Sequence, residues 1–317
     1  MNASPNWIRR RPRLSRGDMP DVTEAEPLTQ PGTGFWRRLR AVRRITLLLL
    51  WNLIGYPILG LLYVLPGGWE KLYPLVYWQA SCALLGMQIR VIGKPAQIPD
   101  RPVIFASNHS SWLDIPALGT ILKASFVAKD DVEHWLLIGT MAKFARTVFV
   151  SRKRSGTGRE REEMGARLDQ GDNLILFPEG TSSDGSRVLP FRSSFFAVSS
   201  AARQPVYQPV SIVYDRLAGL PTTRATRPIF AWYGDMELFP HLWNLAQCRS
   251  YRCTIALHPP LDPVNFPSRK ALAAAVHRAA ANGAAALRQS RPATLAKNEL
   301  ALDTDTRFVA TLKLTWS

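Results

Sequence analysis

The chain has 317 residues, of which 46% are hydrophobic and 10% aromatic, a composition typical of a protein with a folded core. Its formal net charge of +16 favours an anionic partner, such as nucleic acid, an acidic membrane surface or a phosphorylated substrate. The three cysteines, Cys82, Cys248 and Cys253, lack CxxC spacing, which argues against a disulfide framework or a zinc site. We therefore expect buried free thiols.

The first segment, residues 1–34, is predicted to be a disordered basic N-terminus. It is rich in Arg, Pro, Ser, Thr and Gly, and its apolar residues follow no helical or strand period. Because no apolar core follows within these residues, the segment is not typical of a secretory signal.

The second segment, residues 35–88, is predicted to be a membrane-associated helical hairpin. An uncharged apolar run at 45–65 is long enough to cross a bilayer, and the five arginines before it favour a cytoplasmic location for that end. A shorter apolar stretch at 72–87 would return the chain to the same side. Two alternatives stay open: one full span, which would place the remaining chain on the far side, and two buried core helices.

Residues 89–290 alternate short β-rich runs with helical runs, which predicts an α/β domain with a mostly parallel central sheet flanked by helices. The expected strands are 89–92, 103–106, 124–128, 148–150, 173–177, 206–213 and 253–257. The expected helices are 113–122, 131–145, 158–170, 193–202 and 268–290. Ser268 is the expected N-cap of the last helix. Residues 291–317 form a tail without a clear pattern.

The first candidate site is the stretch NHSSWLD, which follows the expected strand 103–106. His109 would lie at the carboxyl end of that strand, where ligands bind in open α/β sheets. An aspartate beside an imidazole fixes its tautomer and raises its basicity, so Asp114 would make His109 a base for a hydroxyl proton. Asp114 is equally explained as an ordinary residue in the first turn of a helix.

The second candidate site is the stretch FPEGTSSDG, which also follows a buried strand. We expect Glu179 to accept a hydrogen bond from a substrate hydroxyl, and Gly180 and Thr181 to belong to the same binding loop. Arg187 and Arg192 would offer guanidinium groups to a phosphate. The alternative is a solvated loop that ends in a helix cap.

Together, these stretches resemble the His-x-x-x-x-Asp and Phe-Pro-Glu-Gly-Thr blocks of glycerolipid acyltransferases of the 1-acylglycerol-3-phosphate O-acyltransferase type. TVFVSRKR and QPVSIVY look like the two remaining blocks and lie in the expected order. The resemblance covers roughly residues 85–260. It implies that Arg152 binds the phosphate of the acceptor and that Pro209 lies on a strand tied to acyl-donor handling.

The resemblance implies an enzyme that moves a fatty acyl group from an acyl-CoA or acyl carrier protein thioester to a lysolipid hydroxyl. The first-choice acceptor is 1-acyl-sn-glycerol-3-phosphate, which would give phosphatidic acid. His109 and Asp114 would be the catalytic pair, with Glu179 positioning the acceptor. No metal and no cofactor beyond the acyl donor are expected. Anionic membrane lipids would be partners, on the cytoplasmic face of the inner membrane.

One position departs from the family pattern. The family commonly carries an arginine directly after Phe-Pro-Glu-Gly-Thr, whereas this chain has Ser182. Either Arg187 or Arg192 substitutes for it, or the acceptor is not lysophosphatidic acid. The Thr-Ser-Ser-Asp-Gly loop and WYGDMELFPHLW at 232–243 are similar to the branch that includes lyso-ornithine lipid acyltransferases, which makes that acceptor the alternative.

Three other classes of protein compete with this interpretation. A nucleic-acid-binding protein explains the charge but not the apolar run at 45–65, and the chain has no recognisable nucleic-acid-binding module. A serine hydrolase would need a Gly-x-Ser-x-Gly elbow, which the chain lacks. A membrane scaffold leaves both site motifs unexplained and predicts that His109→Ala changes nothing.

Overall fold

The computed structural model describes residues 34–65, 67, 69, 72–129, 148–150, 157–200, 203–292 and 309–312. The strands are β1 (Met87–Ile92), β2 (Val103–Ser107), β3 (Ser125–Lys129), β4 (Val148–Val150), β5 (Leu174–Leu176), β6 (Val206–Leu217), β7 (Leu220–Pro221), β8 (Tyr251–Leu257) and β9 (Val309–Leu312). The α-helices are α1 (Gly34–Val64), α2 (Tyr73–Leu85), α3 (Asp114–Gly119), α5 (Thr157–Asp169), α6 (Leu238–Gln247) and α7 (Arg269–Arg288). The 3-10 helices are η3 (Ser193–Ser200), η4 (Arg227–Ile229) and η5 (Pro263–Asn265).

The strands form a mixed, mostly parallel sheet in the order β4-β3-β5-β2-β6-β8-β1-β9, with β7 paired to β6. The run from β4 to β6 is parallel throughout, and β1 pairs with β8 in parallel. β6 and β8 are antiparallel, as are β1 and β9. Every residue of β2 and β5 is buried, as expected for parallel strands covered on both faces. The predicted sheet with flanking helices is therefore confirmed.

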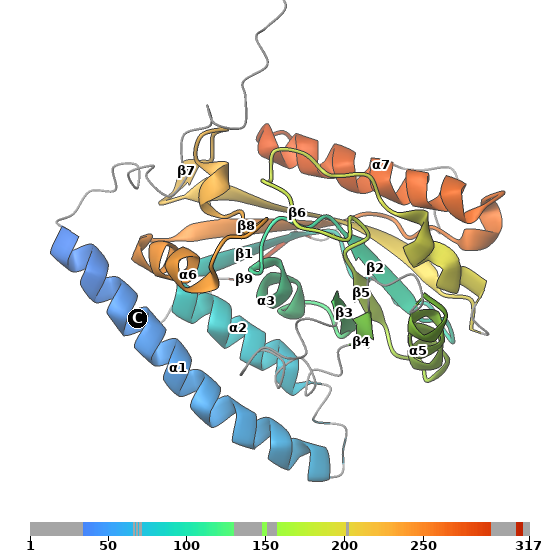
Figure 1. The fold of residues 1–317 in the computed structure, drawn as a ribbon, viewed down its shortest axis with the longest axis horizontal. Coiled ribbons are helices and arrows are strands. Elements are labelled where there is room, and N and C mark those ends of the chain that lie inside the picture. The colour runs from blue at the N-terminus through green and yellow to red at the C-terminus, as the bar shows by residue number, and fades with distance from the viewer. Residues whose placement is uncertain are drawn as a thin grey trace, which may run out of the picture. The chain divides into compact units, whose positions relative to one another are not determined.

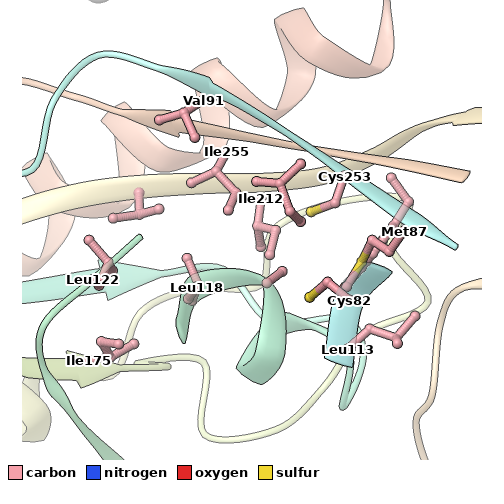
Figure 2. Close-up of a cluster of buried hydrophobic side chains, with 14 of the residues drawn as sticks. Cys82, Met87, Val91, Leu113, Leu118, Leu122, Ile175, Ile212, Cys253 and Ile255 are labelled. Atoms are coloured by element: carbon pink, nitrogen blue, oxygen red, sulfur yellow. The ribbon is translucent and has the colours of Figure 1, made fainter. Parts of the chain in front are cut away.

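Helices cover both faces of the sheet, with α7 on one face and α2 and α3 on the other (Figure 1). On the α2 and α3 face, Cys82 of α2 and Leu118 of α3 belong to one buried apolar cluster with Ile212 of β6 and Ile255 of β8 (Figure 2). A second buried cluster joins the sheet to α5, η3 and α7. All three cysteines are buried and free, which confirms the expectation from the sequence.

The predicted membrane hairpin is wrong. Among the described residues, one helix, α1, has the length and composition to cross a membrane, and most of its apolar side chains are exposed. The second apolar stretch is divided between α2 and β1, and α2 buries Tyr77, Ser81, Cys82 and Leu85. A helix of 13 residues spans only about 20 Å, too short for the hydrocarbon core. The second stretch therefore belongs to the folded core.

Two of the arginines before the apolar run contact protein. The Arg44 guanidinium is buried and donates hydrogen bonds to the carbonyl oxygens of Cys248 (2.6 Å), Arg249 (3.0 Å) and Ala246 (3.2 Å). Arg40 donates to the carbonyl of Gln247 at 2.8 Å. These carbonyls lie at the end of α6, where a helix leaves acceptors unsatisfied and favours cations. The start of α1 is thereby fixed to α6.

Other boundaries differ from the sequence prediction. The helix expected at 113–122 is limited to α3, and the one expected at 193–202 is the 3-10 helix η3. Helix 268–290 is confirmed as α7, and the Ser268 side chain accepts a hydrogen bond from the Ala271 amide at 3.2 Å. The structure adds α6, β7 and β9, which the sequence did not indicate. The predicted helix 131–145 and all but Gly34 of the segment 1–34 lie outside the described residues.

Candidate active site

The loop of residues 108–113, called the His109 loop below, joins β2 to α3 and brings together the two residues of the first candidate site. The His109 Nδ1 atom lies 2.9 Å from Asp114 Oδ2. A spacing of five residues does not place two side chains on one helical face, but Asp114 is the first residue of α3 and the chain bends back toward it. The structure thus brings the predicted pair into direct contact.

Asp114 is fully buried, and both of its carboxylate oxygens accept hydrogen bonds. Besides the His109 ring, Oδ2 accepts from the backbone amides of Ser110 (2.7 Å) and Ser111 (3.0 Å). Oδ1 accepts from the Tyr214 hydroxyl at 2.7 Å. An ionised carboxylate can only accept, so the His109 Nδ1 atom carries the hydrogen and Nε2 is left with a free lone pair. That lone pair can take a proton.

The His109 ring is held on one side by Phe177, which directly follows β5. The two ring centroids lie 4.0 Å apart, with an angle of 20° between the planes. The side chain of His109 retains an exposed fraction of 20%, so a reactant can reach it. Contact with Phe177 and the hydrogen bond to Asp114 together fix both the tilt and the rotation of the imidazole.

Glu179 is buried and supports the backbone of the site. Its Oε1 accepts a hydrogen bond from the His109 amide at 2.8 Å, and its Oε2 accepts from the Leu189 amide at 2.9 Å. Burial raises the pKa of Glu179 to about 7, although the two amide bonds act in the opposite direction. Since each carboxyl oxygen already holds a backbone amide, the geometry supports an indirect effect on the acceptor. Direct contact with a substrate hydroxyl stays a prediction.

Gly180 adopts a left-handed conformation with φ of 68°, and a Cβ atom there would lie 3.1 Å from Cζ of Arg192. The Arg192 guanidinium therefore lies directly over this turn. Thr181, Arg187 and Arg192 are exposed on the same loop, so they are available to a ligand, and their binding roles stay predictions.

Two predicted binding residues lie elsewhere. Arg152 lies outside the described residues. Pro209 is buried within β6, opposite Ala106 of β2, and its carbonyl accepts a hydrogen bond from the His258 amide at 3.0 Å. The structure shows no exposed face of Pro209 to a ligand, and its link to the acyl donor stays a prediction.

Residues that the sequence did not single out complete the site. Asn108 bonds to the backbone of Ile212 through both ends of its side-chain amide, at 3.0 and 2.8 Å, which extends the pairing of β2 with β6 into the His109 loop. Ser183 donates its amide hydrogen to the His109 carbonyl at 3.0 Å. Tyr214 is the last residue of the QPVSIVY block. A tyrosine on a core strand usually needs a hydrogen-bond partner for its buried hydroxyl, and this is the sequence signal that could have singled it out.

Two further histidines have structural partners. His241 accepts a hydrogen bond from the Trp112 indole at 2.9 Å, and its Nε2 donates to the Ile229 carbonyl at 3.1 Å. Burial lowers the pKa of both His241 and His258 to about 4, so both rings are neutral. Among the described residues, no group of three or more His, Cys, Asp or Glu side chains is placed to hold a metal ion.

Comparison with known proteins places this geometry in a biochemical context. A family model described as "Acyltransferase" matches residues 88–213. The lyso-ornithine lipid O-acyltransferase of Brucella abortus is 38% identical over 216 residues, which cover 66% of this chain and 80% of that protein. The 1-acyl-sn-glycerol-3-phosphate acyltransferase of Neisseria gonorrhoeae is 30% identical over 185 residues, covering 57% and 69%.

A solved structure shows the same fold. The crystal structure of the 1-acyl-sn-glycerophosphate acyltransferase from Thermotoga maritima superimposes with a TM-score of 0.61 at 20% identity, covering 80% of this chain and 97% of that one. At this level of identity the likeness concerns the fold alone.

Proposed function

This chain belongs to the acyltransferase family of the 1-acylglycerol-3-phosphate O-acyltransferase type, and we propose that it is a lyso-ornithine lipid O-acyltransferase. The acceptor predicted first from the sequence, lysophosphatidic acid, has weaker support: the relative named for that acceptor is 30% identical, against 38% for the Brucella protein. Ser182, in place of the family's usual arginine, also favours an acceptor other than a lysophosphatidic acid. Transfer to lysophosphatidic acid is the second candidate function.

The observation that carries the proposed chemistry is the contact of 2.9 Å between His109 and the fully buried Asp114. His109 Nε2 takes the proton of the acceptor hydroxyl while the hydroxyl oxygen attacks the thioester carbonyl carbon. The new C–O ester bond forms, the C–S bond breaks, and the leaving thiolate takes up the proton from the imidazolium. Asp114 stabilises the imidazolium between these two steps.

The apolar helix α1 supports membrane association, which suits an enzyme whose lysolipid acceptor lies in the membrane. Protein contacts run along much of its length, because Trp51 donates to the Tyr77 carbonyl at 3.2 Å and Gly55 accepts from the Tyr73 hydroxyl at 3.1 Å. A helix perpendicular to the membrane would draw these contacts into the hydrocarbon. We therefore favour a helix lying in the interface, with exposed residues such as Leu49, Leu53 and Leu61 toward lipid.

The proposed location is the cytoplasmic face of the inner membrane, where acyl-CoA and acyl carrier protein are available. The net charge of +16 would attract both anionic lipid and these acidic acyl donors. The enzyme would thus collect its acceptor from the membrane and its donor from the cytosol.

The test is a competition between acceptors. Purified, detergent-solubilised protein is given one labelled acyl donor with either lyso-ornithine lipid or lysophosphatidic acid, and kcat/KM is measured for each. We expect lyso-ornithine lipid to be preferred by about tenfold or more, a difference of about 1.4 kcal/mol in transition-state binding. The variant Ser182→Arg restores the family's usual residue and should improve use of the phosphate lipid. A preference of the wild type for lysophosphatidic acid would contradict the proposal.

A further inference from the structure

A small cavity lies beside the proposed active site. It is lined by Asn108 and Ser110, the two neighbours of His109 in the chain, and by Tyr214, whose hydroxyl holds Asp114. The charged residues of the lining are Arg227 of η4 and Arg288, the last residue of α7. The cavity is therefore built from the same loop that carries His109.

The two arginines contact each other directly. Arg227 donates a hydrogen bond from Nη2 to the backbone carbonyl of Arg288 at 2.8 Å. The Nε atoms of both residues are buried and have no hydrogen-bond partner in the part of the chain that the structure describes. Across the described ranges of the chain, neither guanidinium forms an ion pair with an acidic side chain.

The pKa of Arg288 reflects both its burial and the excess of positive charge at this position. Burial and the nearby charge of Arg227 lower the pKa of Arg288 to about 10. The carboxylates of Glu179 and Asp184 act in the opposite direction, but neither is close enough for an ion pair. The remaining polar groups of the lining are neutral or already engaged: the Asn108 amide bonds to Ile212 and the Tyr214 hydroxyl bonds to Asp114.

Placing two partly buried cations side by side costs free energy unless an anion binds between them. A guanidinium presents forked donors that match the two oxygens of a carboxylate or a phosphate. A cavity that holds two such groups, next to the base that would act on the acceptor, is suited to the charged end of that acceptor.

We propose that Arg227 and Arg288 form an anion subsite that receives the headgroup carboxylate of the acceptor lipid. This inference rests on the proposed function, since the ornithine of a lyso-ornithine lipid supplies a carboxylate. The subsite would hold the head of the lipid while His109 acts on its hydroxyl, and would thereby discriminate between acceptors. The other source of a suitable anion is a phosphate of the acyl donor.

The test pairs a change in the protein with a change in the ligand. The full chain is assayed with lyso-ornithine lipid and with its carboxyl methyl ester, which lacks the negative charge. Arg288→Gln and Arg227→Gln remove one guanidinium each, and Arg288→Lys keeps the charge. Arg278→Gln, at an exposed position of the same helix α7, is the matched control.

We expect the wild type and Arg278→Gln to use the free acid about tenfold better than the ester in kcat/KM. Arg288→Gln should lose most of this preference by using the acid less well, with the ester and the donor KM unchanged within about twofold. Arg227→Gln should behave alike, and Arg288→Lys should retain part of the preference. An equal loss for acid and ester, or a rise in the donor KM instead, would overturn the assignment.

Failure of the proposed function gives a different result. If the wild type acylates lysophosphatidic acid and not the ornithine lipid, the proposed acceptor is wrong. The subsite is then tested with lysophosphatidic acid against uncharged monoacylglycerol. Loss of the preference for the charged lipid in Arg288→Gln would support an anion subsite for the acceptor headgroup, and an unchanged preference would overturn it.

Discussion

Tyr214→Phe removes one hydroxyl and tests the hydrogen bond that holds Asp114 at the carboxylate oxygen not bonded to His109. The hydroxyl donates to Asp114 Oδ1 at 2.7 Å in a fully buried setting, and no other residue bonds to that oxygen among those described. A hydrogen bond to a charged group contributes about 1.5–3 kcal/mol, so we expect the melting temperature to fall by about 3–6 °C. A carboxylate released on one side holds His109 less firmly, and kcat should fall about tenfold.

Tyr251→Phe is the matched control. Tyr251 is also buried and also packs against Phe230, but its hydroxyl has no hydrogen-bond partner among the described residues. Removing an unpaired buried hydroxyl should leave stability within about 0.5 kcal/mol or raise it. Thermal unfolding and steady-state acyl transfer are measured for both variants in the same detergent. Equal effects of the two substitutions would refute the role assigned to Tyr214.

Three further outcomes follow from the site and from α1. Gly180→Ala should lower the free energy of unfolding by about 1–2 kcal/mol in a denaturation assay, because φ at this position is positive and Arg192 crowds the added methyl. The control Gly165→Ala, at an open helical position, should be neutral or stabilising in the same assay. The pKa of the Glu179 carboxyl is raised from 4.5 to about 7 in the folded protein, so the folded protein keeps this proton to a higher pH than the unfolded chain does. The stability that this group contributes is therefore greatest below pH 4.5 and is lost as the pH rises through 7. Between pH 4.5 and 7, the unfolding free energy of the wild type should fall more steeply than that of Glu179→Gln. Leu53→Asp, at a position 70% exposed on α1, should reduce co-sedimentation with anionic vesicles, and unchanged binding would place lipid contact elsewhere.

Much of the sheet was predictable because its strands are continuous apolar runs that end in turn-forming residues. β2 and β6 were found within one to four residues of their observed ends, and α7 was found from its Ser268 cap. The pairing of His109 with Asp114 was also accessible, since the strand-to-helix position explains how residues five apart can meet.

The rest depended on contacts that span long stretches of chain. Hydropathy shows that 72–87 is apolar, but not that Tyr77 and Leu85 face protein, which is why a hairpin was expected. The bond from Tyr214 to Asp114 joins residues 100 apart, and Arg227 meets Arg288 across 61 positions. Local patterns carry no information on such pairs, because only the folded sheet brings them together.

The central claim is that His109, held by Asp114, is the base for acyl transfer to a lysolipid hydroxyl. The most direct test measures acyl transfer to lyso-ornithine lipid by purified wild type and by His109→Ala, after thermal unfolding has shown that both are folded. We predict robust transfer by the wild type and a loss of about a hundredfold or more in the variant, as expected when a general base is removed. Undiminished transfer by folded His109→Ala would contradict the account.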